Sequence, residues 1–132
     1  MNDRTPRLVL ALCSLLLALG GLAHAAAFRG AAAAIRAANL PSVYANDFKT
    51  LWLADSATLW VVAALFAMLA ARPGMATRSV VILIALVPAA TAVLIYIFVG
   101  GFYAAHLLLG TAAAAAFAGL WSPAFRVRPV AS

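Results

Sequence analysis

The sequence predicts an all-α integral membrane protein, a four-helix up-and-down transmembrane bundle with a short amphipathic helix between the first and second spans. Of its 132 residues, 67% are hydrophobic and 9% are charged, against about 25% charged in soluble domains. Four apolar runs approach the length of about 20 residues that crosses a bilayer. We therefore expect residues 1–132 to form a single transmembrane domain with the lipid bilayer as its main partner.

The first apolar run covers residues 8–27 and follows a basic leader. It ends in Ala23-His24-Ala25, which resembles the A-x-A site of a signal peptide. A cleaved signal usually has an apolar core of about 7–15 residues, and this run is longer. A retained helix is therefore favoured, and removal of residues 1–25 as a signal peptide is the alternative.

The segment between the first two apolar runs, residues 28–47, mixes alanines with polar residues. Arg29 and Arg36 are seven residues apart, so they share one face of a helix, and the alanines favour that conformation. Asn46 or Asp47 is predicted to cap the helix that follows. We expect an amphipathic helix on the bilayer surface, and the alternative is a lid over the polar side chains discussed below.

The remaining spans are predicted at residues 48–71, 79–99 and 102–121, followed by a basic tail at residues 122–132. Pro88 predicts a bend within the third span. Gly100 and Gly101 leave room for only a tight turn, so the last two helices must pack antiparallel. The small residues Gly110, Ala114 and the alanines through Ala118 predict close approach of the fourth span to a neighbour.

Basic residues near the ends of the spans predict the orientation. Six lie on the side of the two termini: Arg4, Arg7, Arg72, Arg78, Arg126 and Arg128. Three lie on the other side: Arg29, Arg36 and Lys49. The side with more basic residues is expected to be cytoplasmic. The chain is therefore expected to be a multi-pass protein of a bacterial inner membrane, with both termini in the cytoplasm. Because the basic residues are scattered, nucleic acid is not an expected partner. A second copy of the chain or another membrane protein is the expected macromolecular partner.

Polar side chains near the outer ends of the spans form the candidate site. The main candidates are His24, Asp55 and His106, because ionisable residues within membrane spans are functional candidates by default. At about 1.5 Å per residue, all three should lie within roughly 10 Å of the outer membrane surface. The supporting residues are Tyr96, Tyr103, Trp52, Asp47 and Lys49.

Four hypotheses account for this cluster. Two histidines and a carboxylate could bind a transition metal, or His24 and His106 could ligate a haem. The cluster could bind a small amphipathic molecule. It could also be a purely structural aromatic belt in which Asp55 pairs with Lys49 or a histidine.

The rest of the sequence limits the function class. No sequence motif of a soluble-type catalyst is present, and the almost entirely apolar cytoplasmic halves of the spans disfavour a channel. The predicted function is therefore a ligand-binding or accessory/assembly component. The alternative is a membrane redox or metal-dependent enzyme that uses His24, Asp55 and His106.

Overall fold

The computed structural model describes residues 4–121, which form only helices and their connections. The elements are α1 (Arg4–Ala26), α2 (Phe28–Ala37), α3 (Ser42–Ala71), the single-turn 3-10 helix η1 (Pro73–Met75), α4 (Arg78–Phe98) and α5 (Tyr103–Trp121). Four helical stretches are long and apolar enough to cross a membrane, with α1 and α2 counted as one. The predicted all-α architecture with four candidate spans is therefore confirmed.

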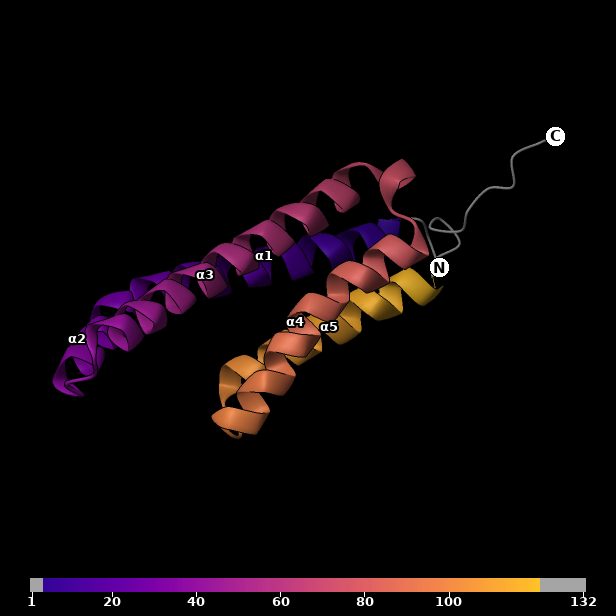
Figure 1. The fold of residues 1–132 in the computed structure, drawn as a ribbon. Helices are drawn as coiled ribbons and strands as arrows, with labels where there is room; N and C mark the ends of the chain where they lie inside the picture. Colours follow the sequence, from indigo (N-terminus) through magenta and orange to yellow (C-terminus); the bar gives the residue numbers. More distant parts are fainter. Residues whose placement is uncertain (1–3, 122–132) are drawn as a thin grey trace.

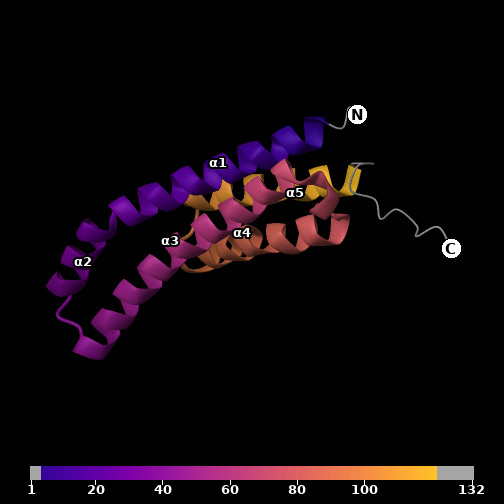
Figure 2. The same ribbon diagram turned by 90° about the horizontal axis from the view of Figure 1, so that it is seen from above.

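The helices are arranged as two antiparallel hairpins (Figure 1). In the first, α1 packs along α3; in the second, α4 packs along α5. The hairpins meet where α1 contacts α5 and α3 contacts α4. Viewed from above, α2 and the start of α3 extend past the α4–α5 hairpin (Figure 2).

The predicted amphipathic helix exists, but as a direct continuation of α1. Only Ala27 separates α1 from α2, and its backbone is helical. The amide of Ala27 donates to the carbonyl oxygen of Ala23, and the amide of Ala31 donates to that of Ala27, both at 3.1 Å. No proline lies in residues 23–37, and the one glycine, Gly30, is isolated among helix-forming residues, so the helix can continue without a break.

The helix of the second span begins at Ser42, six residues before the predicted start of the span. Pro41 precedes its first turn, and no side chain caps it. Asn46 and Asp47 lie inside this helix, so the predicted capping role of these two residues is wrong. A proline just ahead of the first turn has a fixed φ that suits helix initiation, and this local signal outweighed the side-chain caps.

The two hairpins are level at one end and staggered at the other. The continuous α1–α2 stretch has 34 residues and α3 has 30, against 21 for α4 and 19 for α5. The thiol of Cys13 contacts the carbonyl oxygen of Thr111 at 3.6 Å, which fixes the register of α1 against α5. By helical rise from this contact, the end of α2 lies roughly 24 Å beyond the start of α5.

Because the second hairpin is shorter, one face of α3 is not covered by another helix in the half that begins at Ser42. Phe66 and Leu69 on this face are buried in the core with Val62. Tyr44, Phe48, Leu51 and Asp55 follow one another at spacings of four, three and four residues, which continues the same face outward. Their three apolar members are all more than half exposed.

An arginine at the level end of each hairpin binds the end of the antiparallel partner helix. The Nε of Arg7 donates to the carbonyl oxygen of Ala70 at 2.9 Å. A terminal nitrogen of Arg78 donates to the carbonyl oxygen of Leu120 at 2.8 Å. A positive side chain near a helix C-terminus satisfies unpaired carbonyl groups and complements the helix dipole.

The close approach of α5 to its neighbours uses only part of the predicted set of small residues. Gly110 and Ala114 are exposed, and a Cβ on Gly110 would meet nothing within 4 Å, so the prediction is wrong for these two residues. It holds for two of the alanines that follow, because Ala115 and Ala118 are buried. A Cβ on Gly119 would instead lie 3.1 Å from the side chain of Val81. The buried residues of α5 are Ala105, Leu108, Thr111, Ala112, Ala115, Ala118 and Gly119.

The turn between α4 and α5 is as tight as predicted. Gly100 has a φ of 90°, which L-residues with a Cβ rarely adopt. Its amide donates to the carbonyl oxygen of Ile95 at 3.0 Å, which closes the end of α4. The α4 helix is continuous across Pro88, which is buried.

Candidate functional site

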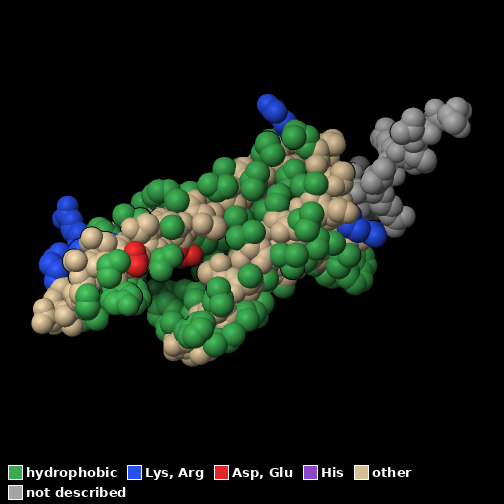
Figure 3. Space-filling view, in the orientation of Figure 1, with side chains coloured by type: hydrophobic (Ala, Val, Ile, Leu, Met, Phe, Trp, Pro, Cys, Tyr) green, Lys and Arg blue, Asp and Glu red, His purple; other side chains and the backbone are tan. Residues whose placement is uncertain are grey.

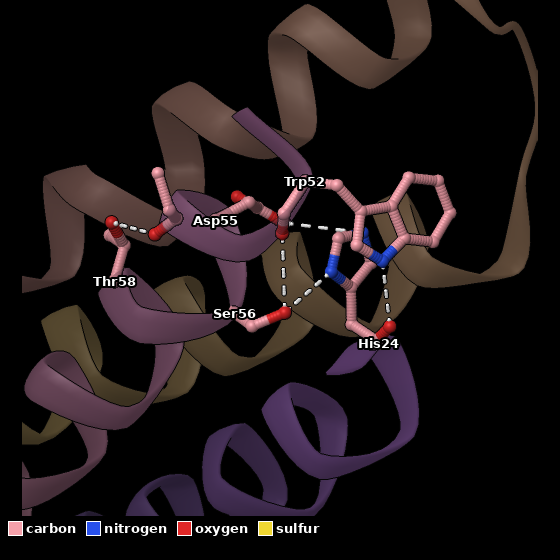
Figure 4. A network of polar contacts seen from close by, with 6 residues as sticks. His24, Trp52, Asp55, Ser56 and Thr58 are labelled. Carbon is pink, nitrogen blue, oxygen red and sulfur yellow. Dashed lines mark hydrogen bonds and ion pairs between the residues drawn. The ribbon is translucent and has the colours of Figure 1, made fainter. Parts of the chain in front are cut away.

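His24, near the end of α1, lies against three residues of α3 (Figure 4). Its Nδ1 is 2.9 Å from the hydroxyl oxygen of Ser56. Its Nε2 is 3.6 Å from a carboxylate oxygen of Asp55. The ring stacks on the indole of Trp52, with centroids 4.2 Å apart and planes 13° from parallel. Because Trp52, Asp55 and Ser56 are spaced i, i+3 and i+4, one side of α3 presents all three to the histidine.

A second contact fixes the indole against α1. The Nε1 of Trp52 donates to the carbonyl oxygen of His24 at 2.8 Å. The stacked rings are thus held from both sides, by a main-chain hydrogen bond and by the Ser56 hydroxyl. We call the group of His24, Trp52, Asp55 and Ser56 the outer polar site.

The outer polar site is partly open. The side chains of His24 and Asp55 are 29% and 37% exposed, whereas Ser56 is buried. Within residues 4–121, Asp55 accepts no hydrogen bond from another side chain, and its one charged contact is His24. Of the two structural partners considered for this carboxylate, the structure therefore selects His24 and not Lys49.

His106 lies elsewhere, within the second hairpin. Its Nδ1 is hydrogen-bonded to the hydroxyl of Tyr96, and the two rings are tilted by 53°. This pair joins the last turns of α4 to the first turns of α5; Tyr96 is partly buried against the core, and His106 is exposed. The tight turn explains the pairing, because it places these turns side by side.

The histidines also differ in depth. Counted outward from the Cys13 to Thr111 contact, His24 is eleven residues away and His106 is five. At about 1.5 Å per residue, His24 lies roughly 9 Å farther than His106 from the level of the Cys13 to Thr111 contact. No group of three or more His, Cys, Asp or Glu side chains is placed to hold a metal ion in the described part of the chain. The structure thus joins His24 to Asp55 and places His106 apart from them.

Tyr103 and Asp47, like Tyr96, lie away from the outer polar site. Tyr103 is 72% exposed and packs its ring on Phe102, with centroids 4.4 Å apart. Asp47 is exposed on α3 and has no ion-pair partner among the residues that the structure describes. Sequence reasoning missed Ser56, although its position beside Asp55 and one turn after Trp52 was a usable signal.

A hollow lies next to this site. Figure 3 shows a recess between the two hairpins, on the staggered side, with acidic side chains at its edge and hydrophobic side chains around it. The uncovered face of α3 forms one side of the stagger. The outer polar site therefore stands where polar and apolar surfaces meet.

Comparison with known proteins does not assign a family. No protein-family model, curated protein or solved structure matches the chain.

Proposed function

We propose that this chain is a multi-pass protein of the bacterial inner membrane that acts as a ligand-binding or accessory component through its outer polar site. Both termini lie in the cytoplasm in this proposal, as the excess of basic residues at the level end favours. The α4 and α5 helices, at roughly 32 and 29 Å, match the bilayer's hydrocarbon thickness of about 30 Å. Membrane partner proteins and self-association are compatible with the same arrangement.

One observation carries this proposal. The Nε2 of His24 and the carboxylate of Asp55 are 3.6 Å apart and partly exposed, and by helical rise His24 lies roughly 4–5 Å beyond the start of α5. A bilayer matched to α4 and α5 would therefore place the outer polar site at the outer headgroup layer. Polar groups at such a boundary can be reached from water and from lipid.

A metal or haem enzyme is the less favoured alternative. It requires His24 and His106 to act on one centre, and they differ in depth by about 9 Å and have different hydrogen-bond partners. The visible spectrum and metal content of the purified full-length protein separate these functions. A Soret band or stoichiometric metal would favour the enzyme.

Reporter fusions test the orientation. Alkaline phosphatase inserted after Leu40 or after Gly100 should be active, because both connections face outward in the proposed topology. The same enzyme fused to the C-terminus should be inactive, and a green fluorescent protein fused there should fluoresce. Active phosphatase at the C-terminus, or a mature chain that begins after Ala25, would contradict this topology.

A further inference from the structure

The hydrogen bonds of Ser56 constrain the protons of the outer polar site. Its hydroxyl oxygen is 3.2 Å from the carbonyl oxygen of Trp52 and 2.9 Å from the Nδ1 of His24. A hydroxyl has one proton, so it can donate to only one of these acceptors. If it donates to Trp52, then the Nδ1 of His24 must donate to Ser56.

When Nδ1 of His24 carries the proton, Nε2 of His24 and the carboxylate of Asp55 are two acceptors that face each other. In a neutral imidazole with its proton on Nδ1, Nε2 carries a lone pair, and it lies 3.6 Å from the Asp55 carboxylate oxygen. In the other arrangement Nε2 carries the proton, but 3.6 Å is too long for a good hydrogen bond. In both cases the carboxylate lacks a close donor among the side chains of residues 4–121.

A primary ammonium group fits this gap. It carries three N–H donors and a positive charge, so one nitrogen can donate to Nε2 and to the carboxylate together. A nitrogen about 2.9 Å from each atom is geometrically compatible with their separation of 3.6 Å. No arginine or lysine occupies this position in the described segment, because His24 is the one residue in ion-pair contact with Asp55.

The surroundings favour an apolar body on the same ligand. Phe48 and Leu51, which share the face of Asp55, are 54% and 64% exposed. The recess between the hairpins is lined with hydrophobic side chains (Figure 3). A small hydrophilic amine would leave these surfaces uncovered.

We propose that the outer polar site binds the primary ammonium group of an amphipathic molecule, held between His24 and Asp55. The apolar part of the ligand packs against Phe48, Leu51 and the recess. This inference rests on the proposed ligand-binding function and specifies its ligand class. An amine-headgroup lipid and a free long-chain amine are the two sources of this chemistry.

Binding is tested on the full chain in nanodiscs of phosphatidylcholine. The variant Trp60→Phe/Trp121→Phe leaves Trp52 as the sole tryptophan, and its fluorescence reports on the ring stacked over His24. Dodecylamine should change this fluorescence at a mole fraction at least tenfold lower than dodecyltrimethylammonium, which has no N–H donor. Replacing part of the phosphatidylcholine with phosphatidylethanolamine tests the lipid source in the same way.

Two acidic residues of α3 provide a matched pair of variants. Asp55→Asn should weaken the dodecylamine response at least tenfold, whereas Asp47→Asn, eight residues away and exposed, should leave it unchanged. Thermal unfolding of both variants shows whether the protein still folds. If Asp55→Asn does not fold, His24→Gln replaces it, with the same expected loss.

The outcomes distinguish failure of the ammonium proposal from failure of the ligand-binding function. Equal responses to dodecylamine, dodecyltrimethylammonium and dodecanol, or a stronger response to dodecyl phosphate, would overturn the ammonium proposal and leave the ligand-binding function standing. A response to dodecylamine alone assigns a free amine, and one to phosphatidylethanolamine assigns a lipid; both support the proposal. No response to any of these amphiphiles or to a quinone would contradict the proposed function as well.

Discussion

Replacing Phe66 with alanine is expected to cause the largest loss of stability of any single truncation in this chain. Phe66 is 0% exposed and lies in the core where the hairpins meet. Such truncations cost about 3–5 kcal/mol in water-soluble proteins. In lipid the transfer part is smaller, because acyl chains also solvate the ring, so we expect roughly 2–3 kcal/mol from lost packing.

The free energy of unfolding can be measured by titration with sodium dodecyl sulfate in mixed micelles. The control is Phe98→Ala, because Phe98 is 80% exposed at the end of α4. It should change the unfolding free energy by less than about 0.5 kcal/mol. Equal losses for the two variants would show that the hairpins do not pack through Phe66.

The second large effect is expected at neighbouring glycines of α1. A Cβ on Gly21 would lie 2.8 Å from two atoms of the Trp60 indole and 3.2 Å from the Cβ of Leu59. The indole would have to move, and its hydrogen bond to the carbonyl oxygen of Ala18 would be lost. Gly21→Ala should therefore destabilise the protein by about 1–3 kcal/mol, the usual cost of overpacking.

Gly20→Ala is the matched control, since a Cβ there would meet nothing within 4 Å. Alanine favours a helix over glycine by up to about 1 kcal/mol, so this variant should be unchanged or more stable. The same unfolding titration measures both variants. If both shift stability in the same direction, α1 and α3 do not approach closely at Gly21.

Local signals in the sequence were sufficient for the helices and one turn. Apolar runs of spanning length predicted the four candidate spans, and paired glycines predicted the turn at Gly100 because a positive φ is needed there. These features depend on residues close together in the chain. They could therefore be derived without knowing how the helices pack.

The stagger of the hairpins could not be derived in this way. The charges at Arg29 and Arg36 suggested that the first span ended near Ala27, yet the alanine-rich backbone continues as a helix to Ala37. Depth counted from assumed span ends therefore placed His24 and His106 at one level. The Cys13 to Thr111 contact, which sets their offset, joins residues 98 positions apart.

Helix rotation decided the members of the outer polar site. Asp55 and His24 were predicted to lie near one another, and they are in contact. Ser56 was not anticipated, because only the packing of α1 on α3 shows that its hydroxyl faces the histidine ring. Small polar residues in apolar helices have this role only when a neighbour provides a partner.

The central claim is that the outer polar site stands at the outer membrane surface, with the start of α3 above it. Single cysteines on α3, in a Cys13→Ala background, test this claim with a membrane-impermeant maleimide added to intact cells whose outer membrane is permeabilised. Tyr44→Cys and Phe48→Cys should react, and Val61→Cys, 59% exposed but facing lipid at its depth, should not. Protection of Phe48→Cys, or labelling of Val61→Cys, would contradict the proposed position of the site.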